Sequence, residues 1–518
     1  MFLILMLQST QALAQGFASV TNLTALTVSA GTGEKPQSKV WTYDNKWWAV
    51  MPNATGTHLW RLDGTTWTDM LTLSASTNTH ADCKVAGAVV HILLYEGTSS
   101  SLVSVEYVPA STTYQLWTTR PSTVALTLDS GVETATIDID GTGRMWLASA
   151  GVSDINVRWS DSPYSTWSSA ITIATGVADD DICAVVYLPG KIGVLWSNQN
   201  TQRFGFKTHN DGAAPATWSA DEVPASQSAL NVGLGMGDDH LNMAVATDGT
   251  LYCAVKTSYD TPGYPKIALL IRRPAGTWDD LYNVSETGTR PIVLLNESIG
   301  KIKIFYSSTE GGGDILYKET ATSAIALSAP LTLISGTNND VTSTKQNYTS
   351  QVVILASNGT SLAGALGTDP VSNLVAHWKM DETTGTTLDD ATTYNNNATT
   401  VGSPTFVSGI QGNALQLNGT SQYATAPNSP SLDIHGAGPL SGITLAAWVK
   451  PTNTTATTQN IIKKANTSGI TDGYELSLSS ATSTWPQKVF FRLNQLTSND
   501  DFRVNSTNVY PLNGTAWM

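Results

Sequence analysis

The chain has 518 residues, of which 41% are hydrophobic and only 13% charged, and its formal net charge is −14. This length predicts two or three domains, and the acidic balance argues against a protein that binds nucleic acid through a basic surface. The hydrophobic content and the 16 tryptophans can fill large cores, which argues against a disordered chain.

Residues 1–15 are predicted to form a signal peptide. Residues 2–7 are a short apolar run, and Ala12 and Ala14 fit the small-x-small pattern that precedes cleavage. The basic residues that usually precede such a run are missing, so a disordered or buried tail is the alternative. No later run approaches the roughly 20 apolar residues that span a bilayer. We therefore expect a secreted or cell-surface protein without a transmembrane segment.

Five tryptophans recur in the next 260 or so residues at steps of 50, 50, 51 and 60, and a period of this size indicates a repeated supersecondary unit. Each repeat contains short apolar strands joined by a tight turn, such as Asp44-Asn45 or Pro189-Gly190. Four antiparallel strands per repeat are typical of a β-propeller, predicted here for residues 16–367. The tryptophans are predicted to be packing anchors: Trp67, Trp117, Trp167, Trp218 and Trp278.

The turns predict the number of repeats. They recur near residues 45, 87, 141, 190, 249, 300 and 359, which favours seven blades, with six as the alternative. Residues 26–31 resemble residues 331–336, so an N-terminal strand is predicted to complete the last blade. Such closure removes exposed sheet edges.

Residues 160–167 and 210–218 resemble degenerate Asp-box repeats of the sialidase-like (BNR) propellers. Sialidases of this superfamily hold the substrate carboxylate with three arginines, and lysine does not replace their bidentate geometry. Only Arg290 clearly precedes an inner strand here. The resemblance therefore implies the fold, and a typical sialidase activity is not expected.

The repeat register predicts a ligand site around the mouth of the central channel. Counting back about nine residues from each inner turn gives six polar residues at the starts of the innermost strands. The alternative is that these side chains are solvated or satisfy loop backbone groups, and no catalytic residue is assigned. The 60-residue step before Trp278 also predicts a functional loop at residues 258–264. The predicted ligand-binding residues are Lys35, His80, Glu133, Asp181, His240 and Arg290.

The three cysteines lie in apolar strand patterns. Their number is odd, and Cys83 and Cys183 occupy similar places in non-adjacent repeats, too far apart for a disulfide. We expect Cys83, Cys183 and Cys253 to be buried free thiols.

Residues 368–373 form a predicted linker, and the pattern changes after it. Residues 374–382, 412–419, 444–451 and 473–476 resemble, in this order, the LamG-like jellyroll (concanavalin A-like lectin/glucanase) family. Residues 374–518 are thus predicted to form a β-sandwich that is incomplete at its C-terminus and exposes an apolar sheet face. The resemblance makes Ca²⁺ a cofactor to consider, with Asp381 and Asp389 as candidate ligands, although turn and cap roles are favoured and Gln422 replaces a frequent Asp.

These observations predict a non-catalytic protein that binds polysaccharide or glycoprotein. A glycoside hydrolase or polysaccharide lyase targeted by the LamG-like module is the alternative, and an adhesion spacer is a second one. An enzyme should show clustered carboxylates with perturbed pKa at the channel mouth, and a binding protein should show exposed aromatic rings there. The glycan and the oligomeric state stay open.

Overall fold

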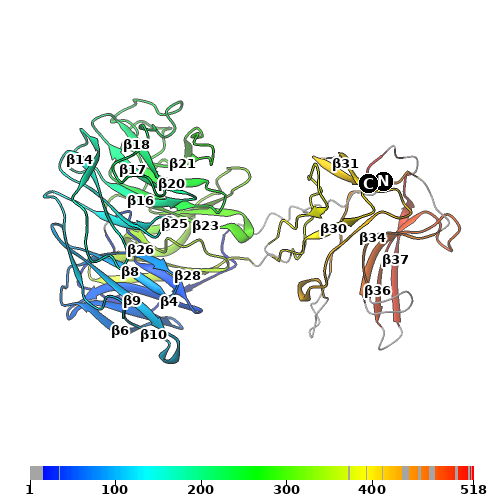
Figure 1. The fold of residues 1–518 in the computed structure, drawn as a ribbon, viewed down its shortest axis with the longest axis horizontal. Helices are drawn as coiled ribbons and strands as arrows, with labels where there is room; N and C mark the ends of the chain where they lie inside the picture. The colour runs from blue at the N-terminus through cyan, green and yellow to red at the C-terminus, as the bar shows by residue number, and fades with distance from the viewer. Residues whose placement is uncertain are drawn as a thin grey trace. The chain divides into compact units, whose positions relative to one another are not determined.

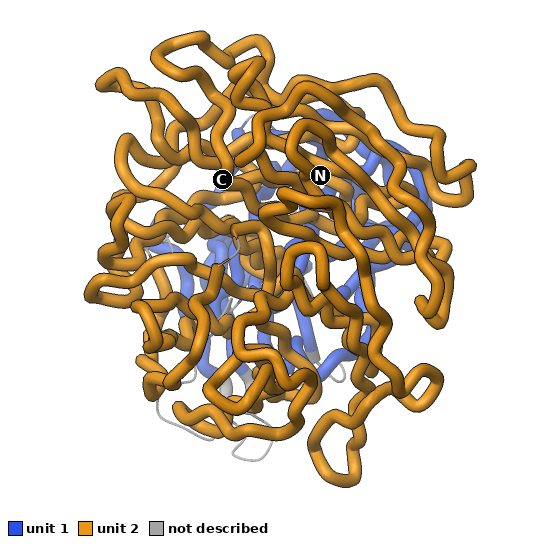
Figure 2. Tube along the Cα trace, turned by 90° about the vertical axis from the view of Figure 1, so that its left-hand side faces the viewer, with its two compact units in different colours: residues 1–13, 372–518 blue, residues 14–371 orange. Residues whose placement is uncertain are grey.

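A computed structural model describes residues 16–33, 35–370, 374–392, 394–410, 412–433, 443–452, 457–465, 473–495, 500–511, 514 and 516–518. The chain divides into two compact units, coloured separately in Figure 2. We call residues 14–371 the N-terminal unit and residues 372–518 the C-terminal unit. The predicted signal peptide, residues 1–15, lies outside the described residues. None of the described helices is long and apolar enough to cross a membrane.

The N-terminal unit is built from antiparallel sheets that follow one another along the chain (Figure 1). Its first three sheets have the strand orders β3-β4-β5-β6, β7-β8-β9-β10 with β11 also on β9, and β12-β13-β14-β15. Their bounds are β3 Val40–Tyr43, β4 Lys46–Asn53, β5 Gly56–Asp63, β6 Thr66–Ser74, β7 His80–Ala86, β8 Val89–Tyr95, β9 Ser99–Val108, the 3₁₀ turn η1 Pro109–Ser111, β10 Thr113–Leu116, β11 Val124–Thr127, β12 Ala135–Ile139, β13 Met145–Ala150, β14 Asp154–Ser160 and β15 Ile171–Thr175.

The following sheets have the orders β16-β17-β18, β19-β20-β21-β22 and β23-β24-β25-β26-β27-β28-β1, with β2 also on β28. In the first of them a single bridge from Phe206 to Glu222 stands where a fourth strand would run. The bounds are β16 Cys183–Leu188, β17 Lys191–Asn198, β18 Arg203–Asn210, β19 Leu241–Val245, β20 Leu251–Lys256, β21 Ile267–Arg272, β22 Tyr282–Ser285, β23 Thr289–Asn296, the 3₁₀ turn η2 Glu297–Ile299, β24 Lys301–Ser307, β25 Gly313–Ala321, β26 Leu331–Thr342, β27 Gln351–Asn358, β28 Ser361–Thr368, β1 Ser19–Asn22 and β2 Leu26–Thr27.

The first strands of successive sheets lie side by side, since β3 contacts β7, β7 contacts β12, β12 contacts β16, β16 contacts β19, β19 contacts β23 and β23 contacts β26. Hydrophobic clusters fill the spaces between neighbouring sheets. Trp48 of β4, for example, packs with Val90 and Ile92 of β8. The sheets are therefore stacked face to face around a shared inner edge.

The predicted turns join strands within these sheets, and the first is a two-residue turn in which Asp44 and Asn45 both have positive φ, 51° and 57°. The turn at Gly359 differs from the prediction. The turn joins β27 to β28. The end of β26 (Asn339 and Thr342) pairs with β27 and is the first strand of this group, so β27 is the second strand and β28 the third.

The N-terminal strand pairs with the last strand of the unit, as predicted from residues 26–31. Leu26 stands opposite Leu362 of β28, and β1 continues the same edge from Ser19 opposite Thr368. Thr368, expected in the linker, is the last residue of β28 instead, and Asp369 next to it is 2% exposed. Residues 371–373 lie outside the described part of the chain.

The repeated tryptophans are packing residues, as predicted. Trp218 meets Trp146 of the preceding sheet edge to face at 5.6 Å between ring centroids, and Trp278 meets Phe206 in the same way at 5.5 Å. All three cysteines are buried free thiols, and burial raises their pKa values.

The C-terminal unit is also all-β in its described residues, with sheets β29-β30-β33, β31-β32 and β34-β35-β36-β37. Two small apolar clusters form its core, one around Leu388 and Leu415 and one around Leu478. Strand β37 carries Phe502 and Val504, which are 61% and 69% exposed. The bounds are β29 Thr387–Leu388, β30 Ala398–Val401, β31 Thr405–Ser408, β32 Asn413–Gln416, β33 Tyr423–Thr425, the 3₁₀ turn η3 Pro430–Leu432, β34 Gln459–Ala465, β35 Gly473–Leu478, β36 Lys488–Gln495 and β37 Asp500–Val509.

Candidate functional site at the inner edge of the sheets

The inner edge of the N-terminal unit ends, at the starts of the first strands, in a cluster of charged side chains that we call the mouth. Lys35 lies at its centre. Its ammonium group forms an ion pair with Glu133 at 2.8 Å and a second one with Asp239. Glu133 precedes β12 and Asp239 precedes β19, so Lys35 connects two sheets that are not neighbours. The segment before β3 thus crosses the inner edge, whereas the sequence predicted Lys35 on the rim.

Electrostatics hold this ion pair in its charged form. Burial favours the neutral form of Lys35, but Asp239 and Glu133 outweigh that cost and raise the pKa of the lysine. Burial likewise disfavours the Asp239 carboxylate, but hydrogen bonding to His240 and the charge of Lys35 dominate and hold its pKa well below the usual value. Asp239 therefore stays ionised, which suits a partner for a cation or an imidazole and not a proton donor.

His240 lies between two carboxylates. Its Nδ1 is 2.5 Å from Oδ1 of Asp239 and 3.1 Å from Oδ1 of Asp238. The imidazole is 4% exposed, and its Nε2 is buried without a hydrogen-bond partner among the described residues. The Nδ1 contacts orient the ring, and Nε2 is the nitrogen that they leave without a partner among the described residues.

A second branch of the mouth is built around Arg290. Its Nε lies 2.7 Å from Oδ1 of Asp340, and its Nη1 donates to the backbone oxygen of Glu310 at 3.3 Å. Lys256 joins the two branches, because its Nζ lies 3.2 Å from Glu310 and 3.5 Å from Asp238. Ion pairs thus run from Lys35 to Glu310, and a hydrogen bond from Arg290 to the backbone oxygen of Glu310 connects them to the Arg290–Asp340 pair.

Three residues of the mouth adopt left-handed backbone conformations that are unusual for side chains other than glycine. The φ angles are 28° at Lys35, 53° at Arg290 and 52° at Asp340. Such conformations cost about 1–3 kcal/mol each and persist where the surroundings fix them, often at functional sites.

A polar cleft adjoins the Arg290 branch. It has a volume of about 380 Å³, and Asn339 in its wall has a buried Oδ1 without a partner among the described residues. Its lining residues are small or carry amide, hydroxyl or carboxylate groups: Gly31, Gly311, Thr337, Asn339, Asp340, Ser357, Asn358 and Gly359. This lining offers hydrogen-bond donors and acceptors, and none of these eight residues has a large apolar side chain.

The structure brings together four of the six residues predicted for the ligand site, namely Lys35, Glu133, His240 and Arg290. Asp181 has the alternative role, because its carboxylate accepts hydrogen bonds from the backbone N–H groups of Ala178 and Gln199. The prediction missed Asp238, Asp239, Lys256, Glu310 and Asp340.

Only the run Asp238-Asp239-His240 carried a signal in the sequence, as three consecutive titratable residues. Its ligand atoms lie within 4.8 Å of one another, as in a metal site, but Lys35 and Lys256 contact the same carboxylates. A metal ion would have to displace these cations. The cluster therefore fits an ion-pair network better. In the C-terminal unit, Asp381 accepts from the backbone N–H of Asn413, and the backbone N–H of Asp389 donates to Glu382.

His80 begins β7 and stands outside the ion-pair network. Burial, together with the nearby charge of Lys39, lowers its pKa from 6.5 to about 4. Between these two pH values the unfolded chain binds a proton that the folded chain does not bind. The contribution of His80 to the free energy of unfolding is therefore fully present above pH 6.5. It falls by up to about 3 kcal/mol as the pH decreases toward 4.

We expect His80→Gln to reduce the loss of stability between pH 6.5 and 4, measured by urea unfolding at several pH values. Burial lowers the pKa of His91 to about 3, so His91 contributes to the same pH dependence and is unchanged in the variant. The dependence of the unfolding free energy on pH should therefore decrease by roughly half in His80→Gln. An unchanged slope would contradict a buried neutral imidazole at position 80.

No family model matches the sequence, and no curated protein matches it. Several solved structures resemble the chain. The polysaccharide lyase Uly1 shares 9% identity, with 68% of this chain and 99% of the lyase covered and a TM-score of 0.42. The Trypanosoma rangeli sialidase bound to the inhibitor DANA shares 12%, with 96% and 86% covered and a TM-score of 0.37. The Penicillium chrysogenum α-L-arabinanase bound to arabinobiose shares 11%, with 59% and 100% covered and a TM-score of 0.38. Similarities of this degree do not identify an activity for this chain.

Proposed function

We propose that this is a secreted or surface-displayed protein that binds a polysaccharide or glycoprotein glycan at the mouth. The observation that carries the proposal is the polar cleft beside the Arg290–Asp340 pair. Sugar hydroxyls both donate and accept hydrogen bonds, so a wall of amide, hydroxyl and carboxylate groups is complementary to them. The three left-handed residues of the mouth support it, since such strain is common where a ligand is held.

The proposal includes an architecture. The N-terminal unit, residues 16–367 in the sequence prediction, is a seven-bladed β-propeller in which β26 belongs to two blades. The support is that Leu331 and Thr332 at its start pair with β25, while Asn339 and Thr342 at its end pair with β27. Residues 374–518 are proposed as the LamG-like jellyroll, and residues 1–15 as the signal peptide that exports the protein.

The two units differ in their exposed aromatic side chains, and we propose different modes of binding for them. Among the described residues of the N-terminal unit, the exposed large apolar side chains are all aliphatic, so the mouth binds by polar contacts. The described exposed aromatic rings, such as Tyr423 at 53% and Trp485 at 50%, lie in the C-terminal unit. Aromatic faces stack on sugar rings, so the C-terminal unit is proposed as a second glycan-binding module.

A glycan array on the protein tests this proposal, with variants that separate the mouth from the rest of the surface. Arg290→Gln should weaken binding of any array hit by about tenfold or more, because it removes the positive charge beside the cleft and leaves Asp340 in its wall without its ion-pair partner. Arg273→Gln is the matched control, since Arg273 also pairs with one carboxylate, Asp279, but lies at the end of β21 away from the mouth.

Absence of binding to every glycan would favour the adhesion spacer. Equal loss of binding in the Arg290 and Arg273 variants would overturn the assignment to the mouth. Both variants should first be shown to unfold at the temperature of the natural protein.

Cleavage of the bound glycan is the second candidate function, and His240 favours it. An imidazole oriented by carboxylates at Nδ1 is a common acid–base arrangement, and Nε2 is the nitrogen that would exchange a proton. If cleavage occurs, His240→Gln should abolish product while the natural protein releases reducing ends, or unsaturated ends if the reaction is an elimination. Binding without either product would exclude cleavage of that glycan.

A further inference from the structure

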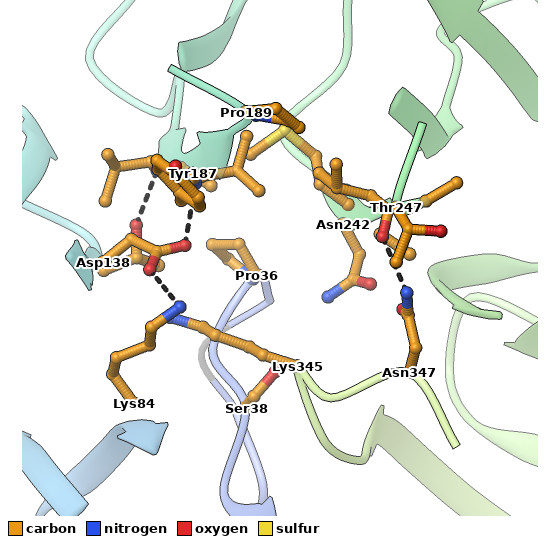
Figure 3. Close-up of a pocket in the computed structure, with 18 residues that line it drawn as sticks. Pro36, Ser38, Lys84, Asp138, Tyr187, Pro189, Asn242, Thr247, Lys345 and Asn347 are labelled. Atoms are coloured by element: carbon orange, nitrogen blue, oxygen red, sulfur yellow. Dashed lines mark hydrogen bonds and ion pairs between the residues drawn. The ribbon is translucent and has the colours of Figure 1, made fainter. Parts of the chain in front are cut away.

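A second cavity lies farther along the inner edge, where β16 and β19 form one part of its wall and residues such as Lys84, Asp138 and Lys345 form the rest (Figure 3). Its volume is about 400 Å³, within the range of small-molecule sites. Pro189 and Thr247, which line it, follow the ends of β16 and β19, whereas the mouth lies at the starts of these strands. The cavity therefore opens at the other end of the inner edge from the mouth.

Neighbouring first strands are normally joined by side chains that reach across to backbone N–H groups. Thr136 and Asp138 of β12 accept from Val185 and Tyr187 of β16, at 3.0 and 2.9 Å. Farther round the unit, Asn242 of β19 accepts from Val293 of β23 at 3.1 Å. Each of these side-chain oxygens accepts the hydrogen bond that a backbone N–H group at the edge of a sheet would otherwise make to water.

Strand β16 breaks this pattern. In both sheets the first strand pairs with the second strand, and alternate residues of the first strand point to the same face of the sheet. By this alternation, Ala184 and Val186 of β16 occupy the positions that correspond to Thr136 and Asp138 of β12. Neither side chain contains an oxygen. The cavity lies at the place where two hydrogen-bonding side chains are replaced by small apolar ones.

The facing strand β19 presents N–H groups to this space. The backbone N–H of Lys256 donates to the backbone oxygen of His240, and the backbone N–H of Ala246 donates to the backbone oxygen of Thr250. These two hydrogen bonds show which residues of β19 bond to β20. By the alternation of an antiparallel ladder, the N–H groups of Met243 and Val245 point the other way. Both residues line the cavity, and β16 provides no side-chain oxygen for them.

The charges around the cavity are balanced. Lys84 is paired with Asp138, and Lys345 is paired with Asp82 at 2.5 Å. Figure 3 shows Asp138 and Lys84 on one side and Asn242 and Asn347 on the other. Because the cations are already compensated, a charged ligand would be desolvated without a free counter-charge, which disfavours it.

We propose that this cavity is a second ligand site, distinct from the mouth, which takes a neutral hydroxyl-bearing molecule of mono- or disaccharide size. The ligand oxygens accept from the backbone N–H groups of Met243 and Val245, as Thr136 and Asp138 do for β16. Val186 and Met243 supply apolar contacts to the carbon face of the ligand. The site is independent of whether the mouth binds a glycan.

The test is ligand-observed NMR and titration with maltose, cellobiose, lactose and sucrose, each added alone. At least one should bind with a Kd of about 1 mM or tighter. Val186→Asp, which supplies the carboxylate that β12 has at Asp138, and Val186→Phe, which fills the space with carbon, should each weaken binding by about tenfold or more. Val152→Asp is the matched control, because this valine is 55% exposed on a loop.

Thr247→Trp gives a test that does not disturb the core, since Thr247 is exposed at the rim of the cavity and a tryptophan there narrows the opening. It should also weaken binding. Failure of all four disaccharides to bind would overturn the proposal. The proposal would also be overturned if the Val186 and Thr247 variants bound the disaccharide with the same affinity as the natural protein. Loss of disaccharide binding in Arg290→Gln would overturn it too, because the ligand would then be assigned to the mouth.

Discussion

Replacing Lys303 by methionine is expected to destabilise the N-terminal unit by about 3–5 kcal/mol. The side chain of Lys303 is fully buried, and its ammonium group lies 2.6 Å from Asp369 and 3.1 Å from Glu319. Burial works against the Glu319 carboxylate, but its hydrogen bond with Lys301 and the charge of Lys303 outweigh this and lower its pKa. Methionine keeps the volume but leaves Asp369 buried without its cation.

Chemical unfolding of the variant and of Lys46→Met measures this effect. Lys46 pairs with Asp63 at 3.2 Å but is 38% exposed, so its loss should cost less than about 1 kcal/mol. A similar, small loss in both variants would show that the buried cluster contributes no more than a surface ion pair. The cluster also holds the start of the described chain, because the backbone N–H of Gly16 donates to Glu319 at 3.1 Å.

Removing residues 16–30 is expected to have the largest effect on stability, more than about 5 kcal/mol, which is a large part of the total for a typical domain. The deletion removes β1 and β2 and leaves the edge of β28 unpaired. It also removes Leu23 and Val28, which are 8% and 2% exposed, each worth roughly 1.5–3 kcal/mol of burial.

Guanidinium unfolding and light scattering should compare chains that begin at residue 16 and at residue 31. The shorter chain should unfold at lower denaturant and aggregate through the open edge of β28. A synthetic peptide of residues 16–30, added in trans, should restore part of the loss, and a scrambled peptide should not. Equal midpoints for the two chains would show that the strand is dispensable.

The mouth shows how far repeat periodicity predicts a site. The period correctly placed Glu133, His240 and Arg290 at the starts of first strands, because position along a repeat fixes position along a sheet. It placed Lys35 on the rim, whereas the segment before β3 crosses to Glu133 and Asp239. A connecting segment has no periodic pattern, and its path depends on the partners that it finds across the inner edge.

The longer step before Trp278 is a second case. The sequence predicted an insertion and a functional loop at residues 258–264, and in the structure Ser258 hydrogen-bonds Asp238 of the mouth at 3.0 Å. Additional residues also lie in the long connection between Glu222 and β19. Tyr259 of the loop is 2% exposed, and its hydroxyl accepts from the backbone N–H of Leu230 in that connection. The length of an insertion is visible in a sequence, but the packing of two insertions on each other is not.

The sequence by itself determined the all-β class, the repeat, the free cysteines, the packing role of the tryptophans and the pairing of an N-terminal strand with the last sheet. These follow from local patterns: alternation, turn residues and a fixed period. Only the tertiary structure decided which charges meet at the mouth, and that Ala184 and Val186 leave a cavity facing Met243 and Val245. Both depend on residues far apart in the chain, whose distances are set by how neighbouring sheets stack and not by the sequence around each residue.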